Sequence, residues 1–153
     1  MKLGFQLATS DEITTVVEMM QDFFAIDAYP FEKKATTSNL IEFVDNRQLG
    51  RLWLITLQTE TIGYVVMTFG FSFEYGGRDA FIDEFFLREA YRNQGIGKKV
   101  LTFLEEQAIS LKINTLHLEV ERHNVKANAL YRKMGYSDND RFLLNKKIRF
   151  HQK

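Results

Sequence analysis

The spacing of apolar residues along this chain alternates between the helical and the strand period, and this restricts the fold to a mixed α/β class. Apolar residues recur three and four positions apart from Ile13 to Phe24 and again from Ile96 to Leu111, which predicts two amphipathic helices. Short runs rich in apolar and β-branched residues predict strands at 2–7, 51–57, 62–69, 80–87, 115–121 and 141–150. We expect a mixed, mostly antiparallel twisted sheet with helices on both faces.

Local signals set the ends of the predicted helices. Thr9 and Glu12 match a capping box before the first helix, and Pro30 ends that helix because the residue before a proline avoids helical angles. A second, shorter helix is predicted at 38–45, with Leu40, Ile41 and Val44 facing inward. A helix is also predicted at 125–134 with Gly135 as its stop, and residues 71–79 predict a loop.

The bulk composition is that of one globular domain spanning residues 1–153. Hydrophobic residues make up 45% and charged residues 26% of the chain, and 14 residues are Phe, which we interpret mainly as core. The chain has no cysteine, which fits a reducing compartment. It has no apolar run of the roughly 20 residues that span a bilayer, and the first ten residues lack the pattern of a signal peptide. We therefore expect a cytoplasmic protein.

The charge balance argues against a polyanionic partner. Lys and Arg total 20, as do Asp and Glu, so no net positive field would hold a nucleic-acid backbone. His117, His123 and His151 show no ligand spacing with carboxylates, and we expect ordinary polar or core histidines and no metal site. The oligomeric state is not defined by the sequence, and a homodimer is one option.

The most informative segment is the stretch 85–98, a strand followed by a polar turn and by glycines that open a helix. The first turn of a helix leaves about four backbone N–H groups unpaired and carries roughly half a positive charge. Gly95 and Gly97 would let phosphate oxygens approach those groups, and Arg92 and Lys98 add positive charge. The spacing fits neither a P-loop nor a complete dinucleotide fingerprint, whereas Arg-x-x-Gly-x-Gly matches in full.

This stretch resembles the coenzyme A signature of the GCN5-related N-acetyltransferase (GNAT) superfamily. Residues 124–136 are similar to a second pattern of that superfamily, Asn-x-x-Ala-x-x-x-Tyr-x-x-x-Gly-aromatic. The resemblance extends over most of the chain and is strongest at 81–136. Residues 82–87 and 140–142 also resemble diamine and other small-amine acetyltransferases.

The resemblance implies the acyl-CoA N-acyltransferase fold, with acetyl-CoA as cosubstrate. Backbone groups of the strand before the glycines would then pair with the pantetheine arm, at Phe85, Phe86 and Leu87. Backbone amides of the turn and helix start would hold the pyrophosphate, at Asn93, Gln94, Gly95, Ile96, Gly97 and Lys98. Asn124 would bond the pantetheine or the edge of the splayed strand.

The same resemblance implies the catalytic residues. Tyr131 matches the general acid, since a phenol with a pKa near 10 is protonated at neutral pH and can donate to a leaving thiolate. Asp83 and Glu84 stand where the family often places a carboxylate base that accepts the proton of the amine. Neighbouring strand residues point to opposite faces, although a bulge would upset that parity. We favour Glu84.

The expected reaction is transfer of an acetyl group to a primary amine, most simply a small cationic one. Aromatic and acidic residues in segments 23–34 and 71–79, Asp27 and Glu74 among them, would suit a cation. A protein lysine or N-terminal acetyltransferase is the alternative enzyme, and it would need an open groove. A non-catalytic coenzyme A-binding regulatory module is the alternative of another class.

Overall fold

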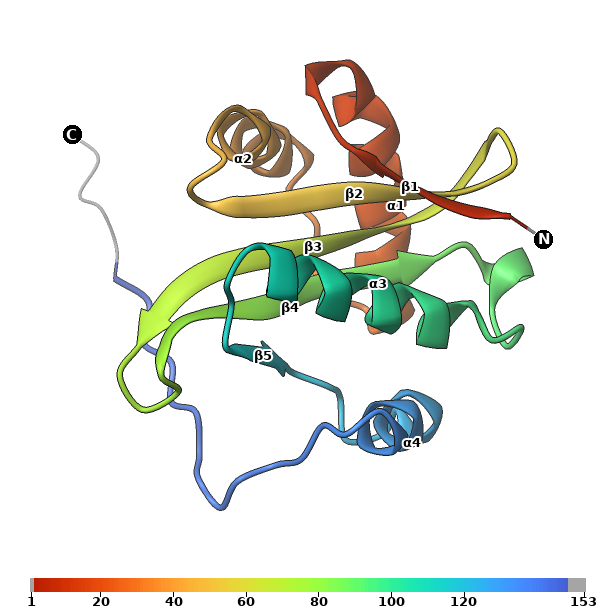
Figure 1. Ribbon diagram of the computed structural model, residues 1–153. Coiled ribbons are helices and arrows are strands. Elements are labelled where there is room, and N and C mark those ends of the chain that lie inside the picture. The colour runs from red at the N-terminus through yellow and green to blue at the C-terminus, as the bar shows by residue number, and fades with distance from the viewer. Residues whose placement is uncertain (1, 149–153) are drawn as a thin grey trace.

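A five-stranded sheet forms the centre of the computed structural model, which describes residues 2–148. The strands follow the order β1-β2-β3-β4-β5, and all neighbouring pairs are antiparallel except β4 and β5, which are parallel (Figure 1). Their bounds are Leu3–Leu7, Gly50–Leu57, Glu60–Ser72, Gly77–Leu87 and Thr115–Leu118. The predicted mixed, mostly antiparallel sheet is confirmed.

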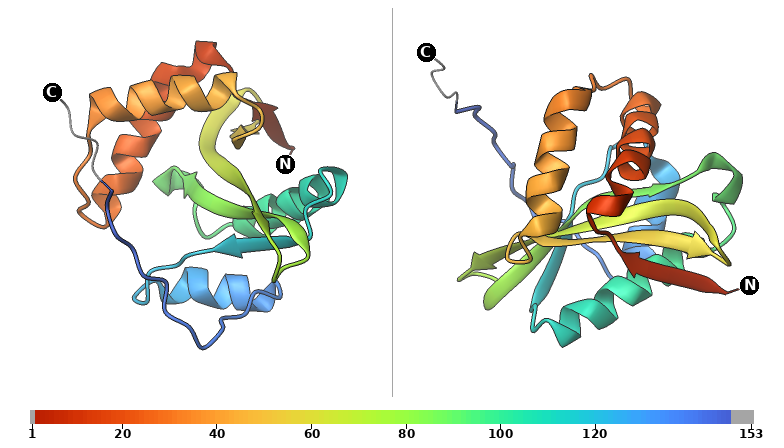
Figure 2. Two further views of the ribbon diagram at one scale, coloured as in Figure 1. Left: turned by 90° about the vertical axis from the view of Figure 1, so that its left-hand side faces the viewer. Right: turned by 90° about the horizontal axis from the view of Figure 1, so that it is seen from above.

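Helices cover both faces of this sheet. α1 (Ile13–Ile26) and α2 (Lys33–Asp45) lie on one face, and α3 (Ile96–Ser110) lies on the other (Figure 2). α4 (Val125–Lys133) lies on the α3 side, beyond β5. None of the described helices is long and apolar enough to cross a membrane.

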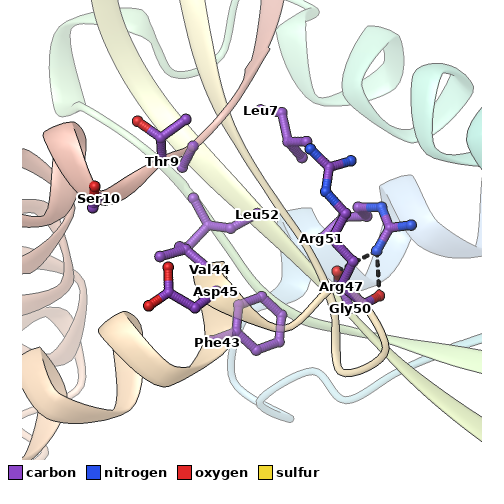
Figure 3. Close-up of a pocket in the computed structure, with 11 residues that line it drawn as sticks. Leu7, Thr9, Ser10, Phe43, Val44, Asp45, Arg47, Gly50, Arg51 and Leu52 are labelled. Atoms are coloured by element: carbon purple, nitrogen blue, oxygen red, sulfur yellow. Dashed lines mark hydrogen bonds between the residues drawn. The ribbon is translucent and has the colours of Figure 1, made fainter.

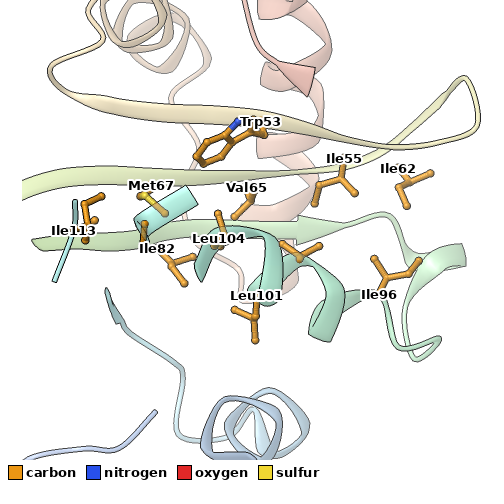
Figure 4. Close-up of a cluster of buried hydrophobic side chains, with 13 residues drawn as sticks. Trp53, Ile55, Ile62, Val65, Met67, Ile82, Ile96, Leu101, Leu104 and Ile113 are labelled. Atoms are coloured by element: carbon orange, nitrogen blue, oxygen red, sulfur yellow. The ribbon is translucent and has the colours of Figure 1, made fainter. Parts of the chain in front are cut away.

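Each face of the sheet has its own apolar cluster. On the α3 side, Val100, Leu101 and Leu104 of the helix pack against buried residues of the central strands (Figure 4). On the other side, α1 contributes its own buried residues, which pack against Leu54, Tyr64, Val66 and Phe86. The helical periods read from the sequence therefore match the buried faces of α1 and α3. They were less accurate for α2, where Leu40 is buried but Ile41 is 47% exposed.

Several predicted boundaries are wrong. α2 begins at Lys33 rather than at residue 38, and β5 ends at Leu118 rather than at residue 121. β3 and β4 extend into the segment predicted as a loop, so that only residues 73–76 connect them. The antiparallel ladder of β3 and β4 continues there because Phe71 pairs with Arg78 and Ser72 with Gly77.

The strand predicted at 141–150 is also wrong for its described part. Residues 141–148 form no strand, and their side chains are exposed. The apolar residues that predicted a strand are present, but no neighbouring strand supplies hydrogen bonds to this segment in the described chain. Residues 149 and 150 lie outside the described residues.

Candidate active site

The site begins where β4 and β5 diverge. Their parallel pairing runs from Asp79 beside Thr115 to Ile82 beside Leu118 and then ends. From Glu84 to Leu87, β4 is paired with β3 on one side only, within the part of the chain that the structure describes. Backbone groups of Phe85, Phe86 and Leu87 are thus on a strand with one free edge, which can accept an extended ligand as an added strand. In Figure 1, β5 turns away from β4 toward α4.

The turn after β4 exposes the N-terminus of α3. Gly95 is the N-cap residue and has a left-handed φ of 80°, and no side chain caps this helix end. A Cβ atom at Gly95 would have no described atom within 4 Å, so its surroundings are open. Ile96 is buried and offers only its backbone amide, whereas Asn93, Gln94 and Lys98 are exposed. The arrangement suits an anion at the unpaired N–H groups.

Gly97 has a different role from Gly95. A Cβ atom at Gly97 would lie 3.0 Å from Cδ2 of Leu130 on α4 and 3.8 Å from Cε2 of Phe85. The missing side chain therefore lets the first turn of α3 approach α4 and β4 closely. Both glycines were expected to give access to phosphate, but Gly95 lies in open surroundings and Gly97 is packed against Leu130.

The basic residues around this turn also differ from expectation. Arg92 donates from Nε to the carbonyl oxygen of Leu87 at 2.8 Å, and its guanidinium lies 5.5 Å from the centroid of the Phe86 ring. Arg92 thus fastens the turn to the end of β4. Lys126, which the sequence analysis did not single out, reaches the turn from α4 with Nζ 3.4 Å from Oδ1 of Asn93.

A bulge in β4 decides how the two candidate carboxylates lie. Val66 pairs with Glu84 and Met67 with Ile82, so Asp83 is an extra residue and strict alternation is lost. Burial raises the pKa of Glu84, and the negative charge of the neighbouring Asp83 adds a smaller increase. Asp83 is exposed, whereas Glu84 is half-buried.

Glu84 is held by a buried phenol. The hydroxyl of Tyr64 donates to Oε1 of Glu84 at 2.7 Å, and Tyr64 is fully buried on β3. Loss of hydration, opposed by this hydrogen bond and reinforced by the charge of Asp83, raises the pKa of Glu84 to about 7. Sequence reasoning missed Tyr64, because a tyrosine among valines in a strand gives no sign of its cross-strand partner.

Aromatic rings of α1 close the region around this carboxyl group. Phe23 packs edge-on against Tyr64, with ring centroids 6.4 Å apart, and lies 5.9 Å from the ring of Phe86. Asp27 follows Phe23 by one helical turn. The C-terminal end of α1 is therefore near Glu84, and the helix dipole adds partial negative charge at that end.

Tyr131 lies on α4, the helix that β5 leads into. It is half-buried among residues of the α3-side cluster, and burial raises the pKa of its phenol. Its ring is 6.0 Å from that of Tyr136, whose hydroxyl is buried and has no hydrogen-bond partner among the described residues. Asn124 accepts a hydrogen bond at Oδ1 from the amide of Ala127 at 3.2 Å, so it caps α4.

Two contacts join the loop after α1 to the loop after β5. His123 Nε2 lies 2.9 Å from Oδ1 of Asp27, and the hydroxyl of Tyr29 donates to Oε1 of Glu121. The partners are more than 90 residues apart in sequence. These contacts bring Asp27 and Glu121 together beside the α1 end of the site.

The other segment expected at the entrance lies elsewhere. The Tyr75 carbonyl accepts from Thr115 Oγ1 at 3.4 Å, at the start of β5, and Glu74 pairs with Arg141. Residues 115 and 121 are roughly 20 Å apart along an extended chain. Segments 23–34 and 71–79 therefore do not form one pocket, and Glu74 belongs to the hairpin tip.

The described histidines have carboxylate partners. His117 Nε2 lies 2.9 Å from Oδ2 of Asp79, whose carboxyl is almost fully buried, and His123 pairs with Asp27 as above. His151 lies outside the described residues. No group of three or more His, Asp or Glu side chains suited to a metal was found among residues 2–148.

A separate hollow of about 170 Å³ lies at the opposite end of α1 (Figure 3). It is lined by Thr9 and Ser10 before the helix, by Asp45 at the end of α2, and by Arg47 and Arg51. None of the candidate catalytic residues lines it. The candidate functional site is therefore the region where β4 and β5 diverge, and not this hollow.

Comparison with known proteins agrees with this geometry. The model of the acetyltransferase (GNAT) family matches residues 15–136. The chain belongs to the GNAT family. The matched residues include the bulge of β4, the glycine turn and α4, so the family assignment covers every element of the candidate site.

Two curated GNAT relatives are similar over part of the chain. An uncharacterized N-acetyltransferase, YycN of Bacillus subtilis, is 37% identical over 75 residues, which cover 49% of this chain and 47% of the relative. Thialysine N-epsilon-acetyltransferase of Bos taurus is 31% identical over 77 residues, 50% of this chain and 45% of the relative. The chain thus spans about half the length of these relatives.

A solved structure is similar over nearly the whole chain. The integron cassette protein HFX_CASS3, from the mobile metagenome of the Cole Harbour salt marsh, has a TM-score of 0.83 and 28% identity. The match covers 95% of this chain and 90% of that protein.

The burial of Glu84 predicts a stability change that depends on pH. Its folded-state pKa of about 7 lies above the ordinary 4.5, so the folded protein binds the proton more tightly than the unfolded chain and loses stability as pH rises through that interval. Glu84→Gln should therefore raise the free energy of unfolding by up to about 3 kcal/mol at pH 8 and by much less at pH 5. Urea titrations at both pH values measure this difference.

The exposed Glu119→Gln is the matched control and should change stability little at either pH. An equal gain for Glu84→Gln at both pH values would assign the effect to packing rather than to ionisation.

Proposed function

We propose that this protein is an acetyl-CoA-dependent N-acetyltransferase that acetylates the primary amine of a small cationic molecule. The observation that carries the proposal is Glu84, a largely buried carboxyl group with a pKa of about 7 beside the free edge of β4. A base titrating near neutral pH suits removal of a proton from an ammonium group, which must become neutral before it can attack.

The backbone groups where β4 and β5 diverge, and those at the start of α3, suit different parts of coenzyme A. The unpaired amides at the start of α3, with Gly95 in open surroundings, suit the pyrophosphate. The free edge of Phe85, Phe86 and Leu87 suits the amides of the pantetheine arm. The bound cosubstrate would supply the activated acetyl group as a thioester.

Each catalytic group would then move one proton. Glu84 takes a proton from the ammonium group of the acceptor, directly or through water, while the buried Tyr64 hydroxyl holds the carboxylate in place. Tyr131 donates its phenol proton to the sulfur of the leaving thiolate. Burial raises the pKa of Tyr131, which keeps the phenol protonated until a thiolate develops.

The charges at the acceptor side favour a cation. Glu84, Asp83, Asp27 and the carbonyl end of α1 lie on this side, and Glu121 joins them through its contact with Tyr29. The two contacts also join the loop after α1 to the loop after β5. Two joined loops would suit a small acceptor better than they would suit a peptide, which needs an open groove. The similarity to an enzyme named for thialysine, a small amine, supports the same substrate class.

The two alternatives predict different outcomes in one assay. The parent protein is incubated with acetyl-CoA and a panel of diamines, cationic amino acids, neutral amines and lysine peptides, and free thiol release is followed. We expect turnover with small cationic amines, rising with pH through about 7 as Glu84 ionises. Preference for peptides would indicate a protein acetyltransferase, and binding without any turnover would indicate a regulatory module.

Tyr131→Phe should lower turnover far more than it lowers affinity for the cosubstrate. The phenol proton is used only when the thiolate leaves, so its loss should reduce kcat on the order of 10²–10⁴-fold. Isothermal titration with coenzyme A should give an almost unchanged Kd. Tyr136→Phe is the control on the neighbouring ring, and turnover unaffected by Tyr131→Phe would reassign that residue to packing.

Gly95→Asp should weaken coenzyme A binding much more than Gly95→Asn. Both side chains have the same size and both tolerate a left-handed φ, and the position is open, so the fold is retained. Only the aspartate places a negative charge beside the expected pyrophosphate, which should raise Kd by at least about tenfold relative to asparagine. Equal Kd values for the two variants would place the anion elsewhere.

A further inference from the structure

Three arginine side chains gather at the end of the sheet that is opposite to the glycine turn. Arg51 is at the start of β2, Arg78 is at the start of β4, and Arg47 is in the loop after α2. β4 runs from Gly77 to Leu87, which corresponds to roughly 30 Å of extended chain. The cluster is therefore well separated from the residues after β4 that suit the pyrophosphate.

Two of the three guanidinium groups share one aromatic ring. Cζ of Arg51 lies 5.1 Å from the centroid of the Phe69 ring, and Cζ of Arg78 lies 5.8 Å from it. Arg51 pairs with Met67 in the β2–β3 ladder. Arg78 pairs with Phe71 in the β3–β4 ladder. Both partners are two residues from Phe69, so the two arginines reach this ring from opposite neighbouring strands on one face of the sheet.

The loop after α2 is fastened to the same place. Nη1 of Arg51 donates to the carbonyl oxygens of Arg47 and of Gly50, the latter at 2.7 Å. The amide of Phe69 donates to the carbonyl oxygen of Leu49 at 2.9 Å. These bonds fix the backbone at Arg47 beside β2 and β3 before any ligand arrives, which reduces the entropy cost of binding.

The three positive charges have no acidic partner that would neutralise them. Within residues 2–148, no carboxylate forms an ion pair with Arg47, Arg51 or Arg78. Burial, together with the positive charges of Arg47 and Arg78, lowers the pKa of Arg51. The like charges are thus close enough to repel one another. Asp45 also lines the neighbouring hollow, but Figure 3 shows its carboxyl group on the other side of the hollow from the guanidinium groups of Arg47 and Arg51.

The hollow supplies the space for an anion. Its volume is about 170 Å³, and both Arg47 and Arg51 line it. A water molecule takes up roughly 30 Å³ of the liquid, so a tetrahedral oxyanion fits there together with some of its hydration. A guanidinium group carries its N–H donors in a planar fork that matches two oxygens of a phosphate. Charge, donor geometry and space therefore all suit the same kind of ligand.

We propose that this end of the sheet is a second anion site, in which Arg47 and Arg51 bind a phosphate group at the edge of the hollow and Arg78 adds its charge across Phe69. The site is independent of the proposed acetyl transfer, because none of its residues takes part in that reaction. The phosphate is either the free ion or a group carried by a small organic molecule. A ligand that binds only the folded chain stabilises it, so binding can be followed by unfolding.

The first test titrates inorganic phosphate into the Gly95→Asp variant, in which the anion site expected at the start of α3 is blocked. Ionic strength is kept constant with sodium chloride, and the thermal midpoint should rise with phosphate and then level off. Arg47→Gln with Arg78→Gln should raise the phosphate Kd at least about tenfold. Both side chains are exposed, so the circular dichroism spectrum should not change. Arg51 is left in place because its side chain bonds the backbone of the loop.

Arg122→Gln with Lys133→Gln is the matched control, because it removes two exposed positive charges from the loop after β5 and from α4. It should leave the phosphate Kd unchanged. An equal rise in Kd for the two double variants would assign the effect to net charge and overturn the proposal. A midpoint that responds to chloride as it does to phosphate would overturn it as well.

The second test locates the anion by the backbone amide resonances of the isotope-labelled Gly95→Asp protein. Phosphate should shift the amide signals of Gly50, Arg51 and Phe69, and the shifts should shrink when Arg47 and Arg78 are replaced by glutamine. Shifts confined to the start of α3, or spread evenly over the chain, would contradict a site at this end of the sheet.

The same titration with glycerol 3-phosphate distinguishes the two sources of the phosphate group. Tighter binding of the ester than of inorganic phosphate would indicate a phosphorylated small molecule, and equal or weaker binding would indicate the free ion. Failure of both ligands to bind would overturn the proposal, whether or not the protein binds coenzyme A.

Discussion

The loss of pairing between β4 and β5 after Ile82 is the feature on which the site depends. A strand bonded on one side only has a row of backbone donors and acceptors with no internal partner, and such groups bind water or a ligand. The same divergence lets the chain after β5 turn into α4, which brings Tyr131 to the α3 side of the sheet. The bulge at Asp83 comes directly after the last paired residue, so the change in side-chain direction and the opening of the sheet occur together.

The raised pKa of Glu84 follows from the loss of hydration around its carboxyl group. Glu84 has one strong partner, the Tyr64 hydroxyl, and that partner is itself fully buried. The phenol lowers the pKa of the carboxyl group, but desolvation has the larger effect and Asp83 adds to it. Phe23 on α1 packs against Tyr64 and Phe86, and this aromatic cover keeps the Glu84 carboxyl group desolvated. Burial of a charge costs stability, and the fold tolerates this cost at Glu84, the residue that we propose as the base.

Features carried by neighbouring residues could be predicted from the sequence, and features that depend on distant partners could not. The glycine turn, the apolar face of α3 and the stop at Gly135 are local, and the structure contains all three. The hydrogen bond of Tyr64 to Glu84 depends on the register of two strands, and the pairing of Asp27 with His123 joins loops almost 100 residues apart. Residues 141–148 have a strand pattern, but forming a strand requires an edge, which a pattern within the segment cannot provide. Glu74 was expected near Asp27 because both of their segments were assigned to the acceptor side, and the topology places them at opposite ends of β5.

The contact of Gly97 with Leu130 has a mechanical consequence. Because residue 97 has no side chain, the first turn of α3 can approach Leu130 of α4 closely, and any larger residue at position 97 would press on the Leu130 side chain. Leu130 is the residue before Tyr131, so the contact relates the position of the Tyr131 phenol to the N-terminus of α3. The absence of one methyl group at residue 97 therefore lets the start of α3 approach the part of α4 that carries Tyr131.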